Sequence, residues 1–304
     1  MLITDLVKEG RDFNSFLREL RTDSLSNAYL ISSEDKLLLE TFSRLAIQAL
    51  FCTNEIAPCG KCLMCRKAEN NTLLDILTFG DGEGIIKKEE IEKLITEIMT
   101  KPFESERKVF VIKNAERMNA SSQNMLLKTL EELPSYAHVF LLVTNELNIL
   151  STIKSRVRKI SLSSFTEEEI MSICYSDNAG KIAKVCGGFA TRAIAFCENK
   201  NFGEWYNFSK SIVQSYTKSA FFTEKVAFFL KNKQHFEDLL AMMQNMFHLA
   251  LKKEMEADCS EMALIKCIEA INRCNQKLRT NANMTAVVDE LFMTILEEKN
   301  RWKM

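Results

Sequence analysis

The chain has 304 residues, and its hydrophobic content of 46% is enough for about two domains with buried cores, or three if one is small. Its 40 basic and 41 acidic residues nearly cancel, which argues against a surface dedicated to nucleic acid or to a membrane. The N-terminus is charged, and no stretch approaches the roughly 20 apolar residues of a membrane span. We therefore expect a cytoplasmic protein with no membrane partner.

The N-terminal half alternates short apolar runs with helical apolar spacing. In chain order, the pattern predicts a helix, strand, helix, strand and helix over residues 13–20, 28–32, 36–50, 74–79 and 88–100. It then predicts strand 109–112, helix 121–133 and strand 138–143, followed by a short helix. Helix 121–133 begins after a polar cluster that starts at Asn119 and ends before Pro134. Two buried parallel strands joined by a crossover helix indicate an α/β core.

Four cysteines are clustered after the second predicted helix, at Cys52, Cys59, Cys62 and Cys65. In a reducing compartment, four thiols within 14 residues favour a tetrahedral Zn²⁺ site over disulfides. Close spacing is also compatible with an iron–sulfur cluster, although nothing in the sequence indicates electron transfer. A site with four cysteine corners leaves no open position for a catalytic water, so we expect a structural metal. The other six cysteines are single, and we expect them to be buried.

The C-terminal half has the pattern of an all-α protein. Short helices are predicted over residues 166–174, 180–186 and 189–197. No proline follows Pro134 and no glycine follows Gly203, while apolar residues recur at helical spacing within 222–230, 236–251, 262–271 and 287–295. We expect a helical domain of about five helices.

Several motifs in the middle of the chain carry a family resemblance. They are Arg117-Met118, Ser122-Gln123-Asn124, the run Leu126 to Glu132 with Pro134, and Ile153 to Arg156. Together they resemble the clamp-loader branch of the AAA+ ATPases, and more narrowly the delta-prime subunits of bacterial DNA polymerase III, over roughly the first 200 residues. The resemblance implies an AAA+-like core at 1–163 with the zinc module at 52–65, a small helical lid at 164–205 and a helical collar at 206–304.

The resemblance also locates where a nucleotide would bind, and the expected residues are missing. A phosphate loop needs two glycines, a lysine and a hydroxyl in the turn between the first strand and its helix. This sequence has Ser33, Leu38, Leu39 and Glu40 at those four positions. Where a working ATPase carries acidic residues at the end of the strand 109–112, it has Lys113 and Asn114. We therefore expect no nucleotide cofactor and no ATPase activity of the chain's own.

Ser155 and Arg156 match a family motif whose arginine points into a neighbouring subunit's ATP site. A trans-acting guanidinium stabilises charge on the transferred phosphate and needs no nucleotide on its own subunit. Val157 stands where the family usually has cysteine, and Arg158 is an alternative for the same role. Arg192 lies where the family has a second sensor arginine and is interpreted as a structural remnant or interface residue.

These features predict a non-hydrolysing clamp-loader subunit that supports ATP-dependent loading of the sliding clamp onto primed DNA. The partners implied are gamma/tau ATPase subunits and a delta subunit in a pentameric ring, with clamp and DNA bound through the complex. One rival hypothesis is an active gamma/tau-type ATPase, which the degenerate turn disfavours. Another is a zinc protein that binds DNA through the cysteine module. This is disfavoured because the module contains only one cation, Lys61, and DNA binding needs several.

Overall fold

The computed structural model describes residues 2–82, 84–214, 219–280 and 282–301. The chain divides into two compact units. The first comprises Met1–Phe165 together with Phe189–Thr191, and the second comprises Thr166–Gly188 and Arg192–Met304. The finer division into core, lid and collar remains a prediction.

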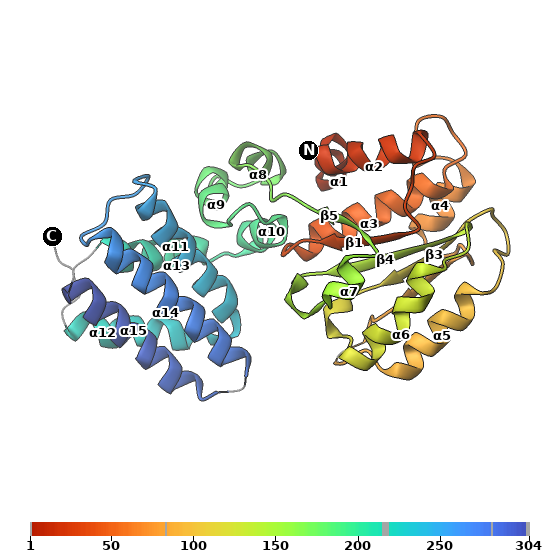
Figure 1. Cartoon of the computed structure of the whole chain (residues 1–304). Helices are drawn as coiled ribbons and strands as arrows, with labels where there is room; N and C mark the ends of the chain where they lie inside the picture. The colour runs from red at the N-terminus through yellow and green to blue at the C-terminus, as the bar shows by residue number, and fades with distance from the viewer. Residues whose placement is uncertain (1, 83, 215–218, 281, 302–304) are drawn as a thin grey trace. The chain divides into compact units, whose positions relative to one another are not determined.

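The first unit contains a parallel sheet of five strands in the order β2-β3-β4-β1-β5 (Figure 1). The strands are β1 (Ala28–Ser32), β2 (Ile76–Phe79), β3 (Lys108–Ile112), β4 (Ala137–Val143) and β5 (Arg158–Ser161). β3 and β4 pair directly and in parallel, with Phe110 opposite Val139, so the predicted pair of strands joined by a crossover helix is confirmed. All residues of β3 and β4 are buried, as expected for a parallel sheet covered on both faces.

Helices cover both faces of this sheet (Figure 1). One face is covered by α1 (Ile3–Glu9), α2 (Arg11–Arg21), α3 (Lys36–Phe51) and α4 (Leu63–Glu69). The other face is covered by α5 (Lys88–Ile98), α6 (Ala120–Glu131) and α7 (Ser151–Lys154). This is the three-layer α/β arrangement that the alternation of strands and helices predicts.

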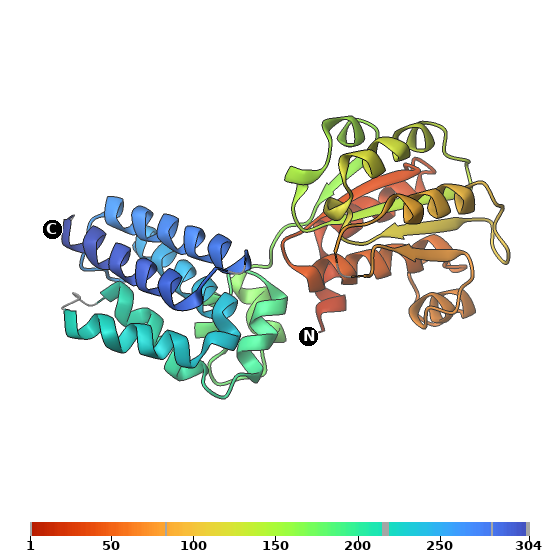
Figure 2. The same cartoon turned by 90° about the horizontal axis from the view of Figure 1, so that it is seen from below.

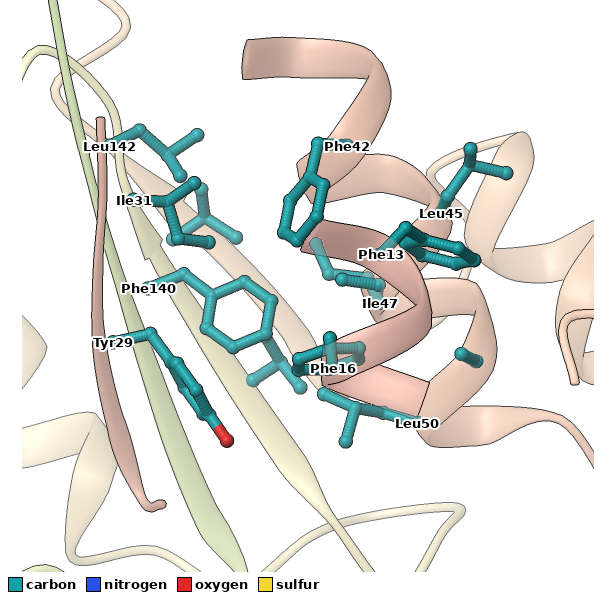
Figure 3. Close-up of a cluster of buried hydrophobic side chains, with 14 of the residues drawn as sticks. Phe13, Phe16, Tyr29, Ile31, Phe42, Leu45, Ile47, Leu50, Phe140 and Leu142 are labelled. Atoms are coloured by element: carbon teal, nitrogen blue, oxygen red, sulfur yellow. The ribbon is translucent and has the colours of Figure 1, made fainter. Parts of the chain in front are cut away.

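Aromatic side chains form the centre of the layer under α2 and α3. Figure 3 shows Phe16 facing Tyr29 and Phe140 on the sheet, with Phe42 of α3 beside it. The ring centroids of Phe16 lie 5.7 Å from Tyr29 and 6.3 Å from Phe140, in edge-to-face geometry. Such pairs add to the free energy gained from burying the rings. The rings therefore fix the position of α2 on the sheet.

The second unit is entirely helical in its described residues. It contains α8 (Glu167–Ile173) and α9 (Ala179–Val185), most of α10 (Ala190–Glu198), and the longer α11 (Phe202–Gln214), α12 (Ser219–Lys231), α13 (Phe236–Leu251), α14 (Glu261–Arg279) and α15 (Met284–Arg301). α14 packs against both α13 and α15, and these three run side by side (Figures 1 and 2). The five helices α11 to α15 agree with the predicted all-α region.

Four elements were not predicted from the sequence: α1, α4, β5 and α11. α1 and α4 have seven residues each, too few for a helical period to stand out. β5 carries Arg158 and Lys159 and is mostly exposed. Its sequence therefore lacks the apolar run that indicates a strand. It is a strand because its backbone pairs with β1, with Leu30 opposite Lys159. Among the described residues, no helix is both long and apolar enough to cross a membrane.

His138 provides a test of this core through the pH dependence of stability. It is buried in β4, its Nδ1 donates to the carbonyl of Ser26 over 3.4 Å, and burial lowers its pKa from 6.5 to about 4. Because the unfolded chain binds this proton at a higher pH, the contribution of His138 is lost as pH falls from 6.5 toward 4. We expect a loss of about 3 kcal/mol in the free energy of unfolding over that range.

The measurement is urea unfolding of the native chain and of His138→Asn between pH 7 and pH 4. Asparagine does not titrate, so the difference between the two proteins should change by the expected amount across this range. A constant difference would show that His138 does not titrate on unfolding.

Candidate functional site

The turn between β1 and α3 is closed by the carboxylate of Asp35. Asp35 is the N-cap of α3, and its Oδ1 accepts hydrogen bonds from the backbone N–H of Leu37 at 3.1 Å and of Leu38 at 3.5 Å. The hydroxyl of Ser33 in turn accepts from the N–H of Asp35 over 3.1 Å. Asp35 is 2% exposed. Its negative charge therefore lies buried at the positive end of the α3 dipole.

Residues 190 and 191, which belong to the same unit, complete the environment of this carboxylate. The N–H of Ala190 donates to Oδ2 over 2.5 Å, and the N–H and hydroxyl of Thr191 both donate to Asp35. Five donor groups thus converge on one buried anion. In a phosphate loop, the N–H groups at the start of this helix would bind phosphate. Here the chain's own carboxylate already takes the N–H groups of Leu37 and Leu38.

The remaining residues of the turn divide between the core and the surface. Leu38 and Leu39 are 4% and 5% exposed and belong to the apolar core under α3. Lys36 and Glu40 are exposed. The positions where a phosphate loop carries its lysine and its magnesium-binding hydroxyl hold Leu39 and Glu40.

The end of β3 has no carboxylate at the two positions where an ATPase would use one. Nζ of Lys113 pairs with Asp81 over 2.7 Å, and Nδ2 of Asn114 donates to the carbonyl of Gly80 over 3.2 Å. Glu116, the nearby acid, accepts hydrogen bonds from the N–H and hydroxyl of Thr144 at 3.2 and 2.6 Å. These contacts connect the loops after β2, β3 and β4, so all three side chains have structural roles.

The four clustered cysteines converge on one point. Cys52 follows the last residue of α3, Cys62 is the N-cap of α4, and Cys65 lies in the first turn of α4. Their four Sγ atoms lie within 4.8 Å of one another, and the Cys59 and Cys65 sulfurs are 4.0 Å apart. Sulfurs around a tetrahedral zinc lie about 3.8 Å apart, given a Zn–S distance of about 2.3 Å. The arrangement is compatible with a bound metal ion.

Backbone hydrogen bonds favour the thiolate forms that a metal requires. The N–H groups of Lys61 and Cys62 donate to the sulfur of Cys59 and lower its pKa. Burial opposes ionisation of Cys62, but hydrogen bonds from Thr53, Cys65 and neighbouring thiols outweigh it and lower its pKa to about 6. Gly60 allows this turn through its positive φ of 67°.

Cys65 is the exception, because burial raises its pKa above the usual range for a thiol. A thiolate at this position needs a cation beside it. The donor set therefore fits a divalent metal ion, which would supply that charge.

Arg156 lies at the end of α7, beside the last turn of α6. Its Nε donates to Oε1 of Glu131 over 2.5 Å, and its Nη2 forms an ion pair with the same oxygen. Nη1 donates to the carbonyl of Thr152 over 3.0 Å, and Ser155 lies within reach at 3.4 Å. The two residues of the predicted motif are therefore in contact, and the arginine is paired within its own chain.

The alternative arginine, Arg158, is on β5 and contacts a different acid. Its Nη2 lies 2.7 Å from Oε1 of Glu19. The other oxygen of Glu19 accepts a hydrogen bond of 2.9 Å from the hydroxyl of Tyr29. Arg192, assigned above to a remnant sensor position, donates from Nη1 to the carbonyl of Cys186 over 2.8 Å.

Two residues of the site were not identified by sequence reasoning. Asp35 was not singled out, although an aspartate directly before a helix is a strong N-cap signal. Glu131 was noted as part of a motif, without a role. Its contact with Arg156 joins positions 25 residues apart, and no local pattern indicates such a pair.

Comparison with known proteins places these features in a family. A family model described as DNA polymerase III, delta subunit, matches residues 9–166. DNA polymerase III subunit gamma of Buchnera aphidicola subsp. Acyrthosiphon pisum is 30% identical over 168 residues, which are 55% of this chain and 46% of that protein. DNA polymerase III subunit delta' of Bacillus subtilis is 23% identical over 308 residues, covering 91% of this chain and 93% of that protein.

The two kinds of relative differ in how much of their length is matched. The chain covers less than half of several gamma and tau/gamma relatives, but nearly all of the delta' relative. A solved DNA polymerase III gamma subunit-related protein from Thermotoga maritima superposes with a TM-score of 0.53 at 17% identity, over 93% of this chain and 99% of that one. This structural likeness supports the fold alone.

The buried carboxylate of Asp35 gives a direct test of the turn. Replacing Asp35 with alanine leaves its donors without their acceptor, so the free energy of unfolding should fall by about 2–3 kcal/mol. Glu34→Ala, at an exposed position of the same turn, is the matched control and should change it by less than about 0.5 kcal/mol. Chemical denaturation followed by circular dichroism measures both, and equal stability of the two variants would contradict the assigned role of Asp35.

Proposed function

Because this chain belongs to the DNA polymerase III delta-subunit family of clamp-loader proteins, we propose that it acts as the delta-prime type of subunit. In this role it joins gamma/tau ATPase subunits and a delta subunit in a pentameric ring. The ring loads the sliding clamp onto primed DNA at the expense of ATP. This chain contacts clamp and DNA through the complex and works in the cytoplasm, with no membrane partner.

The proposed subunit binds and hydrolyses no nucleotide of its own. The observation that carries this is the carboxylate of Asp35 at the start of α3, which occupies the N–H groups that a phosphate would need. A nucleotide phosphate at this place would meet a buried negative charge of like sign. The absence of a carboxylate at Lys113 and Asn114 also removes the ligands for magnesium.

The contribution of this subunit to catalysis is made in trans by Arg156. An arginine at a subunit boundary stabilises the charge that develops on the transferred phosphate of a neighbour's ATP. Ser155 lies beside it and orients it through the Nη1 contact. Arg158 is the less suitable candidate, because Glu19, its partner, is also bound to Tyr29 and is only 18% exposed in its side chain.

Cys52, Cys59, Cys62 and Cys65 hold a structural Zn²⁺ in this proposal. The ion neutralises the thiolates and ties the end of α3 to the start of α4. We further propose that the chain has three domains, a core at 1–163, a lid at 164–205 and a collar at 206–304 through which subunits associate.

A gamma-type ATPase is the second candidate, because gamma relatives reach 30% identity in the N-terminal half. The coverage of the delta' relative, which extends over both halves of the chain, favours the first candidate. Saturable binding of ATP to the isolated chain would favour the gamma-type enzyme instead.

The trans-acting arginine is tested by Arg156→Ala. We expect this variant to assemble, but the ATP hydrolysis of gamma/tau with delta, clamp and primed DNA should fall at least about threefold. The loss is partial because the other ATP sites in the ring keep their own arginines. Steady-state phosphate release measures the rate, and gel filtration confirms assembly.

Arg158→Ala is the matched control in this assay and should leave the rate near the native value. If the two variants exchange these outcomes, then Arg158 is the finger. If neither variant lowers the rate, then the chain contributes no arginine in trans and has at most a scaffolding role.

The zinc proposal predicts one metal ion per chain and a loss of it in Cys62→Ser. We expect the melting temperature of this variant to fall by about 5 °C, since roughly 2 kcal/mol shifts a unit of this size by that amount. Cys197→Ser lies outside the cluster and should retain the metal. Elemental analysis measures the content. Iron with visible absorption would identify an iron–sulfur cluster, and no metal in native protein would contradict the proposal.

A further inference from the structure

The guanidinium of Arg156 is bound by groups of its own chain. Its Nε and Nη2 both bind Oε1 of Glu131, and its Nη1 donates to the carbonyl of Thr152. Every nitrogen of the group therefore has a partner within the subunit. A side chain held in this way lies along the surface between the ends of α6 and α7. Its exposed fraction is 34%.

Arg156 and Arg158 line the same surface hollow of about 490 Å³, together with Glu19, Ser24, Ser26, Ser155 and Val157. Each arginine has one acidic partner, but the two pairs differ in how firmly the acid is fixed. The side chain of Glu19 is 18% exposed and is also bound by Tyr29, whereas that of Glu131 is 48% exposed. Arg158 is itself the more exposed arginine, at 58% against 34% for Arg156, but its acid is more buried and is bound twice. The contact between Glu131 and Arg156 is therefore the one whose acid an incoming anion displaces more easily.

We propose that Glu131 is a positioning residue that holds Arg156 against its own subunit and releases it to the phosphates of a nucleotide on the neighbouring subunit. This inference rests on the proposed trans-acting role of Arg156. A triphosphate carries more negative charge than one carboxylate and accepts the guanidinium in bidentate fashion. The exchange replaces one acceptor with another, so the arginine is not left without a partner at either stage. Before a neighbour with ATP arrives, the arginine is withheld.

The chain offers a matched pair of variants at adjacent positions. Glu131→Gln keeps the shape of the side chain but removes the charge that binds Arg156. Glu132→Gln makes the same change one residue later, at an exposed position where the described structure shows no hydrogen bond or ion pair to Arg156, and serves as the control.

The first measurement detects the contact in the isolated chain. The ¹⁵N–¹H signal of Arg156 Nε is identified by its loss in Arg156→Ala. We expect Glu131→Gln to shift this signal and to speed its exchange with water, because the hydrogen bond to Oε1 is weakened. Glu132→Gln should leave it unchanged. An unchanged signal in Glu131→Gln overturns the proposal directly.

The second measurement is ATP hydrolysis by the complete complex as a function of ATP concentration. Glu131→Gln should lower the ATP concentration for half-maximal stimulation by up to about fivefold, the size expected for an exposed ion pair. The maximal rate should be maintained or raised. The complexes with native chain and with Glu132→Gln should give the same dependence of rate on ATP concentration. A shift in signal with native kinetics, or a reduced maximal rate, overturns the inference and leaves the proposed function intact.

A double variant separates the two proposals. If Glu131 acts through Arg156, then Glu131→Gln has no further effect in the Arg156→Ala background. An effect that persists there shows that Glu131 acts by another route and overturns the inference. If the complex containing Arg156→Ala alone hydrolyses ATP like the complex with native chain, the proposed trans-acting role of Arg156 fails, and with it the idea that Glu131 restrains a finger.

Discussion

The buried carboxylate of Asp35 is the interaction on which the arrangement of the first unit depends. It ends the turn after β1, caps α3 and accepts the N–H groups of Ala190 and Thr191. A buried charge is costly unless it is fully hydrogen-bonded, and here five donors satisfy it. The same contacts consume the N–H groups that would otherwise form an anion site at this helix end. One side chain thus stabilises the fold and carries the proposal that this chain binds no nucleotide.

Charge is also internally balanced at the candidate arginine. Arg156 and Arg158 line one hollow, yet each has a carboxylate from a different element, Glu131 of α6 and Glu19 of α2. Such pairing reduces the positive field that the isolated chain presents there. In the proposed complex, Arg156 would leave Glu131 only when a more highly charged anion, such as a nucleotide phosphate, is within reach. This gives a physical reason for the acidic residue at the end of α6.

The cysteine module is local in sequence but joins two helices. Cys52 follows α3 and Cys65 lies in α4, so a metal at this place crosslinks the two across a short loop. The buried sulfur of Cys65 and the hydrogen-bonded sulfur of Cys59 have opposite pKa tendencies. A bound divalent ion would stabilise the thiolate form of both Cys59 and Cys65.

The sequence by itself determined the alternation of strands and helices in the first unit, the all-helical second unit and the cysteine cluster, because periodicity and short spacing are local signals. It also showed that Leu38 and Leu39 stand where a phosphate loop has its second glycine and its lysine. Only the tertiary structure decided that β5 is a strand, since its charged residues acquire regular structure by pairing with β1. It likewise decided the distant partners, Ala190 for Asp35 and Glu131 for Arg156, which lie 155 and 25 residues away. Such contacts depend on how the chain folds back on itself, and a local pattern of residues does not indicate which distant residues will meet.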